Sequence, residues 1–234
     1  MNVSYRKLYS PQLGQDFELK AYGHAGKPVL VFPTFSGRFW DYEGFGMFDV
    51  LGPFVEAGDI QVFCVDGRDW EGWNHPARGP HMGERHRAYE RCIVQDVVPY
   101  VARELGAGEK LLATGTSFGA YHALNFALKF PDSFDACICL SGVYSLPFVL
   151  GGYYDETVYF NDIVAYLPGL TDEAIVGKLR RGYFVICHGR GPWEICNDQA
   201  AHVARHLESK RIPAWYSVWD ERYPHDWWAW KEQL

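Results

Sequence analysis

Six short apolar runs, separated by longer polar or amphipathic segments, constrain the fold of this chain more than any other feature of its sequence. The runs are rich in β-branched residues, and a strand formed by each of them would be buried on both faces. This property is typical of a parallel sheet that carries helices on each side. The runs are Pro28–Phe32, Ile60–Val65, Leu111–Ala113, Ala136–Leu140, Tyr183–Cys187 and Ala214–Val218.

Several of the segments between these runs have helical patterns. Apolar residues recur at four-residue spacing in an otherwise charged segment from about 84 to 105, which predicts an amphipathic helix. Two further helices are predicted over Phe118–Phe130 and Asn197–Ser209. The alternation of strands and helices predicts an α/β domain with a mostly parallel central sheet and helices on both faces. The apolar stripe of the first helix consists of Tyr89, Ile93, Val97, Val101 and Leu105.

Two segments depart from this alternation. Tyr5–Tyr9 and Phe17–Tyr22 alternate apolar and polar residues on either side of a Pro-Gln-Leu-Gly turn, which predicts a β-hairpin. The segment 144–181 has no clear strand and separates two core strands, so we expect it to form an excursion over the sheet edge. Because no repeat, low-complexity tract or linker divides the chain, we expect a single domain over residues 1–234.

Charge and composition argue against several classes of function. The 234 residues carry a formal net charge of −7 and no basic cluster, so nucleic acid is not an expected partner. No apolar stretch approaches the ~20 residues needed to span a membrane, and the N-terminus lacks the apolar core of a signal peptide. Four of the six cysteines lie in apolar runs, and none has the spacing of a zinc site. Buried reduced thiols of this kind indicate a cytoplasmic protein.

The stretch Gly115-Thr116-Ser117-Phe118-Gly119 has the pattern G-x-S-x-G, follows a predicted strand and opens a predicted helix. In this context the pattern is typical of a serine nucleophile on a tight strand-to-helix turn, with its oxygen projecting from the sheet. The flanking glycines would let the strand and the helix pack close to the turn. An ordinary glycine-rich loop is the alternative interpretation, and the order of strand, motif and helix favours the nucleophile.

A serine hydroxyl needs a general base, and His225 is the predicted one. In a fold with this nucleophile the histidine comes last in the chain, on a loop after the final strand, which is where His225 stands. The other histidines fit less well. His122 lies on the helix after Ser117 and is expected to point into packing, while His188 directly follows the penultimate strand and is expected at most to support the site.

The acid of the triad is expected after the penultimate strand, where it would fix the tautomer of the imidazole and stabilise its charged form. Two carboxylates stand there. We predict Glu194, which lies in the loop, and keep Asp198 as the alternative because it falls in the first turn of the next helix, where an acid also serves the helix dipole.

Two backbone N–H groups are expected to bind the oxyanion of the reaction. The first is that of Phe118, directly after the nucleophile. The second comes from the loop after the first core strand, Phe32-Pro33-Thr34-Phe35-Ser36-Gly37. No His-Gly dipeptide marks the position there, and we predict the N–H of Ser36, with Phe35 as the alternative.

Four stretches of the sequence resemble the putative-esterase branch of the α/β-hydrolase superfamily, which includes esterase D, enterochelin esterase and the mycolyltransferases. They are Val31–Met47, Thr114–Phe134, Cys139–Tyr144 and the closing His225–Trp230, "HDWWAW". The resemblance implies an α/β-hydrolase fold and a serine carboxylesterase with no metal and no cofactor. The sequence departs from the family at the acid, because esterase D-like proteins usually have Gly-x-x-Asp where this chain has Gly-Arg-Gly-Pro-Trp-Glu.

The expected reaction is hydrolysis of a small or acyl ester through an acyl-enzyme on Ser117. Two alternatives stay open at this point. An acyltransferase would use the same triad and pass the acyl group to an alcohol or sugar, and a non-catalytic binding protein can share the fold. The expected partner is a small-molecule ester, and the sequence indicates no oligomeric state.

Two further features have competing interpretations. The loop Asp66–Trp73, "DGRDWEGW", follows a strand and can border the site, although a solvated loop is the expectation for so polar a sequence. Aromatic residues of the 144–181 segment can line an acyl pocket or pack in the core of that segment; they are Tyr153, Tyr154, Tyr159 and Phe160.

Overall fold

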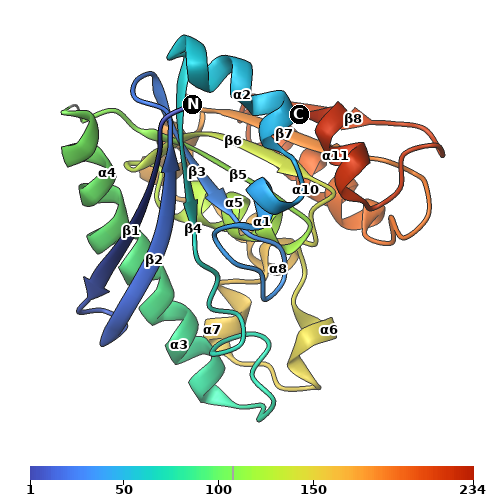
Figure 1. Ribbon diagram of the computed structural model, residues 1–234. Coiled ribbons are helices and arrows are strands. Elements are labelled where there is room, and N and C mark those ends of the chain that lie inside the picture. The colour runs from blue at the N-terminus through green and yellow to red at the C-terminus, as the bar shows by residue number, and fades with distance from the viewer. Residues whose placement is uncertain (107) are drawn as a thin grey trace.

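The computed structural model describes residues 1–106 and 108–234 and is built on one eight-stranded sheet (Figure 1). The strand order is β1-β2-β4-β3-β5-β6-β7-β8, with β1–β2 and β2–β4 antiparallel and the other five pairs parallel. All six predicted runs form strands, and the predicted hairpin is β1–β2. The strands are β1 (Val3–Ser10), β2 (Gln15–Tyr22), β3 (Lys27–Phe32), β4 (Ile60–Val65), β5 (Leu111–Thr116), β6 (Phe134–Leu140), β7 (Tyr183–His188) and β8 (Ala214–Val218).

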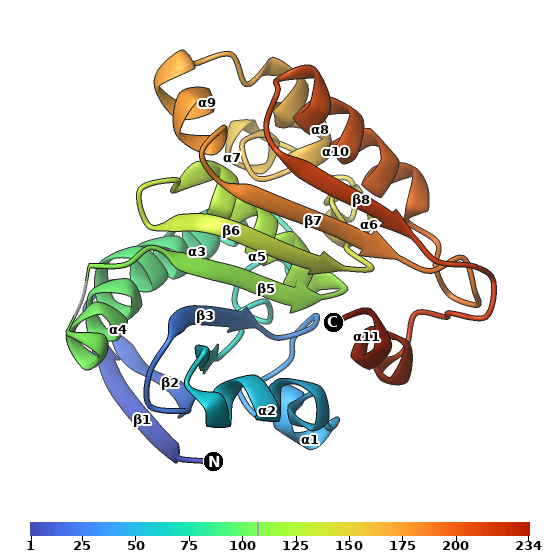
Figure 2. The ribbon, with the colours of Figure 1, turned by 90° about the horizontal axis from the view of Figure 1, so that it is seen from above.

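Helices cover both faces of the sheet, as the sequence predicts (Figure 2). One face carries α3 (Pro80–Arg91), α4 (Val98–Leu105), α5 (Phe118–Lys129) and α10 (Asn197–Ser209). The other face carries α1 (Asp41–Gly44), α2 (Phe48–Ala57) and α11 (Trp227–Gln233). Together with the strand order, these two layers give the α/β-hydrolase fold.

The predicted helix over 84–105 is one helical rod with a wider turn in its middle. A π-helical segment, η1 (Cys92–Val97), joins α3 to α4. The apolar stripe still faces the sheet, and Tyr89, Ile93, Val97 and Val101 are all buried. Burial of that face, rather than helix propensity alone, stabilises the rod.

The segment 144–181 contains no strand. It folds into α6 (Pro147–Leu150), α7 (Glu156–Tyr159), α8 (Ile163–Tyr166), a 3₁₀ turn η2 (Leu167–Gly169) and α9 (Glu173–Leu179). Asp155, Asp162 and Asp172 start three of these helices by accepting backbone N–H groups of the first turn. Because α8 and η2 contact α10 and the segment buries Leu146 and Ile163 in the same core as α5, a single domain over 1–234 remains our proposal.

All six cysteines are free thiols, and only Cys196 is not fully buried. Within residues 1–106 and 108–234, each helix is too short or too polar to span a bilayer.

The side chain of His86, on α3, is fully buried against the rings of Trp73 and His122. Burial, reinforced by His122 and Lys129, holds the pKa of His86 well below its ordinary value of 6.5. The folded chain therefore keeps this ring neutral, whereas the unfolded chain takes up a proton as the pH falls below 6.5.

We expect the free energy of unfolding to fall with decreasing pH below 6.5, with a contribution from His86 of up to about 1.4 kcal/mol per pH unit. In the variant His86→Gln this contribution should disappear. Urea unfolding of both proteins between pH 7.5 and 5 measures it, and His24→Gln serves as a control because His24 is exposed. Equal slopes for His86→Gln and the wild type would contradict the assignment.

Candidate active site

Ser117 lies in the turn that joins β5 to α5. Its backbone has φ 56° and ψ −120°, a conformation that residues with a side chain rarely adopt, and its N–H donates to the Leu140 carbonyl at 2.9 Å. A Cβ on Gly115 would lie 2.4 Å from the Gly119 carbonyl carbon, and a Cβ on Gly119 would lie 2.4 Å from the Phe32 oxygen. Only glycine at both positions allows β5, α5 and β3 to approach so closely at this turn.

His225 lies in the loop between β8 and α11, at the far end of the chain from Ser117. Its Nε2 is 2.9 Å from Ser117 Oγ. The backbone N–H of His225 donates to the Pro192 carbonyl, and its ring packs edge-on against Trp230 at 4.9 Å between centroids. Asp226 caps α11 by accepting the N–H of Trp228, which agrees with a structural role for this neighbour.

Glu194 is the carboxylate beside His225. Its Oε2 is 3.5 Å from His225 Nδ1, and its side chain is 3% exposed. Its Oε1 accepts hydrogen bonds from the Ser141 hydroxyl and, at 3.3 Å, from the Gly189 N–H. Asp198 is exposed in the first turn of α10 and makes no contact with His225 in the described part of the chain. The geometry therefore favours Glu194 over the alternative.

Ser141 is a member of this cluster that the sequence does not identify. It follows β6, has φ 48°, and accepts a hydrogen bond from Trp230 Nε1 at 2.9 Å while donating to Glu194. Both partners are far away in the sequence. The residue stands in the stretch "CLSGVY", but nothing in its spacing to Glu194 or Trp230 indicates the contact.

The two predicted oxyanion donors differ in the structure. In the described residues, the N–H groups of Phe118 and Phe35 have no hydrogen-bond acceptor, and their rings pack edge-to-face at 4.7 Å. The N–H of Ser36 instead donates to Asp69 Oδ2 at 2.9 Å. This hydrogen bond argues against Ser36, the first choice, because an N–H already bound to a carboxylate is not available to an oxyanion. The alternative, Phe35, keeps a free N–H.

An apolar pocket of about 490 Å³ opens beside His225. Phe148 of α6 forms part of its wall, whereas the four aromatic residues considered from the sequence do not line it. A larger hollow of about 610 Å³ lies between α10 and β8, and its lining includes neither the predicted triad residues nor the predicted oxyanion donors. The smaller pocket is therefore the one that belongs to the site. The pocket is lined by Val143, Phe148, Trp193, Ile195, Cys196, Gln199 and His225.

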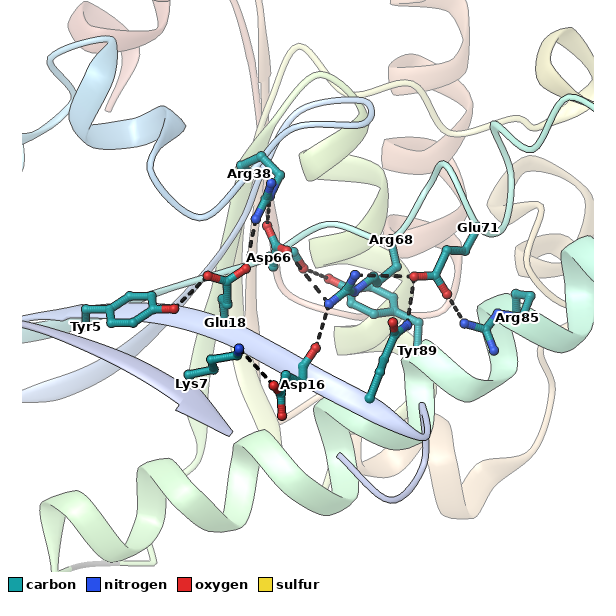
Figure 3. A network of polar contacts seen from close by, with 11 residues as sticks. Tyr5, Lys7, Asp16, Glu18, Arg38, Asp66, Arg68, Glu71, Arg85 and Tyr89 are labelled. Carbon is teal, nitrogen blue, oxygen red and sulfur yellow. Dashed lines mark hydrogen bonds and ion pairs between the residues drawn. The ribbon is translucent and has the colours of Figure 1, made fainter. Parts of the chain in front are cut away.

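The loop Asp66–Trp73 is not solvated, contrary to the expectation. Asp66, Asp69 and Trp73 are buried. The carboxylates tolerate burial because each has charged or polar partners. Asp66 accepts from Arg38 Nε at 2.6 Å (Figure 3). Asp69 binds His122 and the Ser36 N–H. Burial raises the pKa of Asp66, and the Arg38 guanidinium opposes that rise.

The chain matches the family described as "Putative esterase" over residues 10–234. A search of curated proteins gives no match. Among solved structures, a ferulic acid esterase is similar with a TM-score of 0.78 and 18% identity, covering 100% of this chain and 94% of that one. An S-formylglutathione hydrolase from Agrobacterium tumefaciens has a TM-score of 0.73 and 15% identity, covering 97% and 89%. The fluorophosphonate-binding serine hydrolase F of Staphylococcus aureus has a TM-score of 0.71 and 16% identity, covering 99% and 94%.

Proposed function

We propose that this chain, which belongs to the putative esterase family and is a serine hydrolase acting on carboxylic ester bonds, uses Ser117, His225 and Glu194 as its catalytic triad. The observation that carries the proposal is the distance of 2.9 Å between Ser117 Oγ and His225 Nε2. This is hydrogen-bond distance, so the imidazole can take the hydroxyl proton as the oxygen attacks.

The proposed reaction has two halves. Ser117 Oγ attacks the ester carbonyl, His225 takes its proton, and the N–H groups of Phe118 and Phe35 bind the resulting oxyanion. The protonated His225 then gives its proton to the leaving alcohol, and an acyl group remains on Ser117. A water molecule, deprotonated by His225, releases the acid and restores the serine.

Glu194 supports both halves from the other side of the ring. Its carboxylate holds His225 with the Nδ1 proton toward itself and stabilises the imidazolium that forms in each half. Ser141 and the Gly189 N–H bind the second oxygen of the carboxylate, which keeps Glu194 oriented in its buried position.

The pocket beside His225 supports a small ester with an apolar group as the substrate. Its walls include the Phe148 ring and the side chain of Val143, while Trp193 and Ile195 are largely exposed at its border. An apolar or aromatic group of the ester would bury the surface of these side chains as it binds. Two of the similar structures are a ferulic acid esterase and an S-formylglutathione hydrolase, which agrees with a small acyl substrate.

A covalent probe tests the proposed nucleophile. We expect a fluorophosphonate to label the native protein at one site, and peptide mapping to place the label on Ser117. An excess of a p-nitrophenyl ester that carries an apolar acyl group should slow the labelling, because the ester and the probe compete for the same serine. Labelling of another serine, or ester turnover by protein whose Ser117 is fully modified, would overturn the proposal.

A further inference from the structure

A buried carboxylate joins the helix that carries the nucleophile to the loop that carries the proposed oxyanion donor Phe35. Asp69 Oδ1 is 2.8 Å from His122 Nε2, and Asp69 Oδ2 accepts the Ser36 N–H at 2.9 Å. Asp69 and His122 are only 3% and 1% exposed. His122 stands on α5, five residues after Ser117, so this chain of contacts runs from one side of the site to the other.

The backbone that Asp69 holds is in a conformation that does not persist without support. Ser36 has φ 57°, in the left-handed region that is strained for a residue with a side chain. Besides the hydrogen bond from its N–H to Asp69, its hydroxyl oxygen accepts from Asn74 Nδ2 at 2.8 Å. The Gly37 N–H donates to the Thr34 carbonyl at 2.8 Å and closes a turn that contains both Phe35 and Ser36, so fixing Ser36 also restrains the neighbouring Phe35 N–H.

The same loop is held a second time, two residues further on. Arg38 donates through Nε to Asp66 at 2.6 Å and through a terminal nitrogen to Glu18 at 2.9 Å (Figure 3). Asp66, Asp69 and Asn74 all belong to the segment after β4. This one segment therefore contacts the loop after β3 at both Ser36 and Arg38, and Asp69 joins its contact with Ser36 to His122 of α5.

We propose that Asp69 is a positioning residue that sets the Phe35 N–H relative to Ser117. The inference rests on the proposed function, because it concerns the oxyanion of that reaction. His122 donates its Nε2 proton to one oxygen of Asp69 and thereby aims the other oxygen at the Ser36 N–H. Without the carboxylate the turn at Ser36 relaxes, and the Phe35 N–H moves away from the position that the oxyanion takes.

The variant Asp69→Asn tests this role, because its amide keeps the size of the side chain but offers an N–H where one donor now meets an oxygen. We expect kcat for a p-nitrophenyl ester to fall by about 10–100-fold, less than the ~10²–10³ that a lost donor costs, with KM changed by no more than about threefold. A trifluoromethyl ketone, whose adduct with serine carries an oxyanion, should bind more weakly by the same factor as kcat/KM falls. A purely structural role would not couple these two losses.

Two further variants keep the test decisive. Asn74→Ala removes the second contact of Ser36 and should disturb the fold less than Asp69→Asn, because Asn74 is only half-buried. It should show the same pattern with a smaller loss. Asn125→Ala is the matched control: Asn125 is fully buried on the same helix but bonds to Asn161 and Tyr166, away from the loop. We expect it to lower the melting temperature and leave kcat and ketone affinity within about twofold of the wild type.

The result that would overturn the inference is a kcat and a ketone affinity within about twofold of the wild type in Asp69→Asn and Asn74→Ala. Equal losses in Asn125→Ala would overturn it as well, because they would trace the effect to stability. Both results are distinct from failure of the proposed function, which would appear in the wild-type protein as the absence of a label on Ser117.

Discussion

Replacement of Ser117 by alanine is expected to lower kcat for ester hydrolysis by about 10⁴–10⁶-fold. Without the hydroxyl there is no nucleophile for His225 to activate and no acyl-enzyme, and only binding and the oxyanion donors remain to assist attack by water. The turn itself should survive, because alanine meets the same backbone strain at φ 56° as serine does. Steady-state turnover of p-nitrophenyl acetate and the thermal unfolding midpoint of the same sample measure the two quantities.

Thr116→Val provides a matched control from the neighbouring position. The Thr116 hydroxyl is buried and has no hydrogen-bond partner in the described part of the chain, so its replacement by a methyl group should leave kcat within a few-fold and should not lower stability. Contaminating esterase must first be excluded. If the Ser117→Ala protein then retained more than about 1% of wild-type turnover, another group would be the nucleophile.

The strands could be predicted from the sequence because their signal is local. Val29, Leu30 and Val31 are buried on both faces of β3, and a run that is apolar at every position leaves few other structures open to it. The helices on the second face had no such signal. The helix α1 has only one turn, and α2 contains Gly52 and Pro53. Neither helix has an apolar stripe long enough to predict it from the sequence.

Part of the site could be predicted because chain order constrains it. Ser117 was identified from its motif, and His225 from its place after the last strand, and these two side chains lie within hydrogen-bond distance. The choice between Ser36 and Phe35 could not be made in the same way. It depends on which N–H is already bound, and the acceptor, Asp69, stands 33 residues further along the chain.

The composition of the loop after β4 predicts the wrong environment for its aspartates. Four charged residues, two tryptophans and two glycines within Asp66–Trp73 suggest a solvated surface. The structure buries the two aspartates instead, because each is matched by a partner from another element: Arg38 for Asp66, and His122 for Asp69. A single sequence carries no record of such pairings, so a buried polar network cannot be told from an exposed one without coordinates.

The second large effect is expected for Glu194→Gln, which should lower kcat by about 10³–10⁴-fold. The glutamine carbonyl can still accept from Ser141 or Gly189, so the loop should keep its shape. Its amide, however, presents no negative charge to His225 and can donate a hydrogen bond to Nδ1. This bond favours the tautomer protonated at Nε2, which cannot accept the serine proton. The loss should appear in kcat more than in KM, because the imidazolium exists only as the reaction proceeds.

The matched control is Asp198→Asn, which removes the other carboxylate considered for this role. Asp198 is exposed in the first turn of α10, where its charge interacts favourably with the helix dipole. Removal of the charge should lower the free energy of unfolding by roughly 0.3–1 kcal/mol. Its turnover should stay within about twofold of the wild type. If Asp198→Asn showed the larger kinetic loss, the acid of the triad would be Asp198, and the 3.5 Å contact between Glu194 and His225 would have no catalytic role.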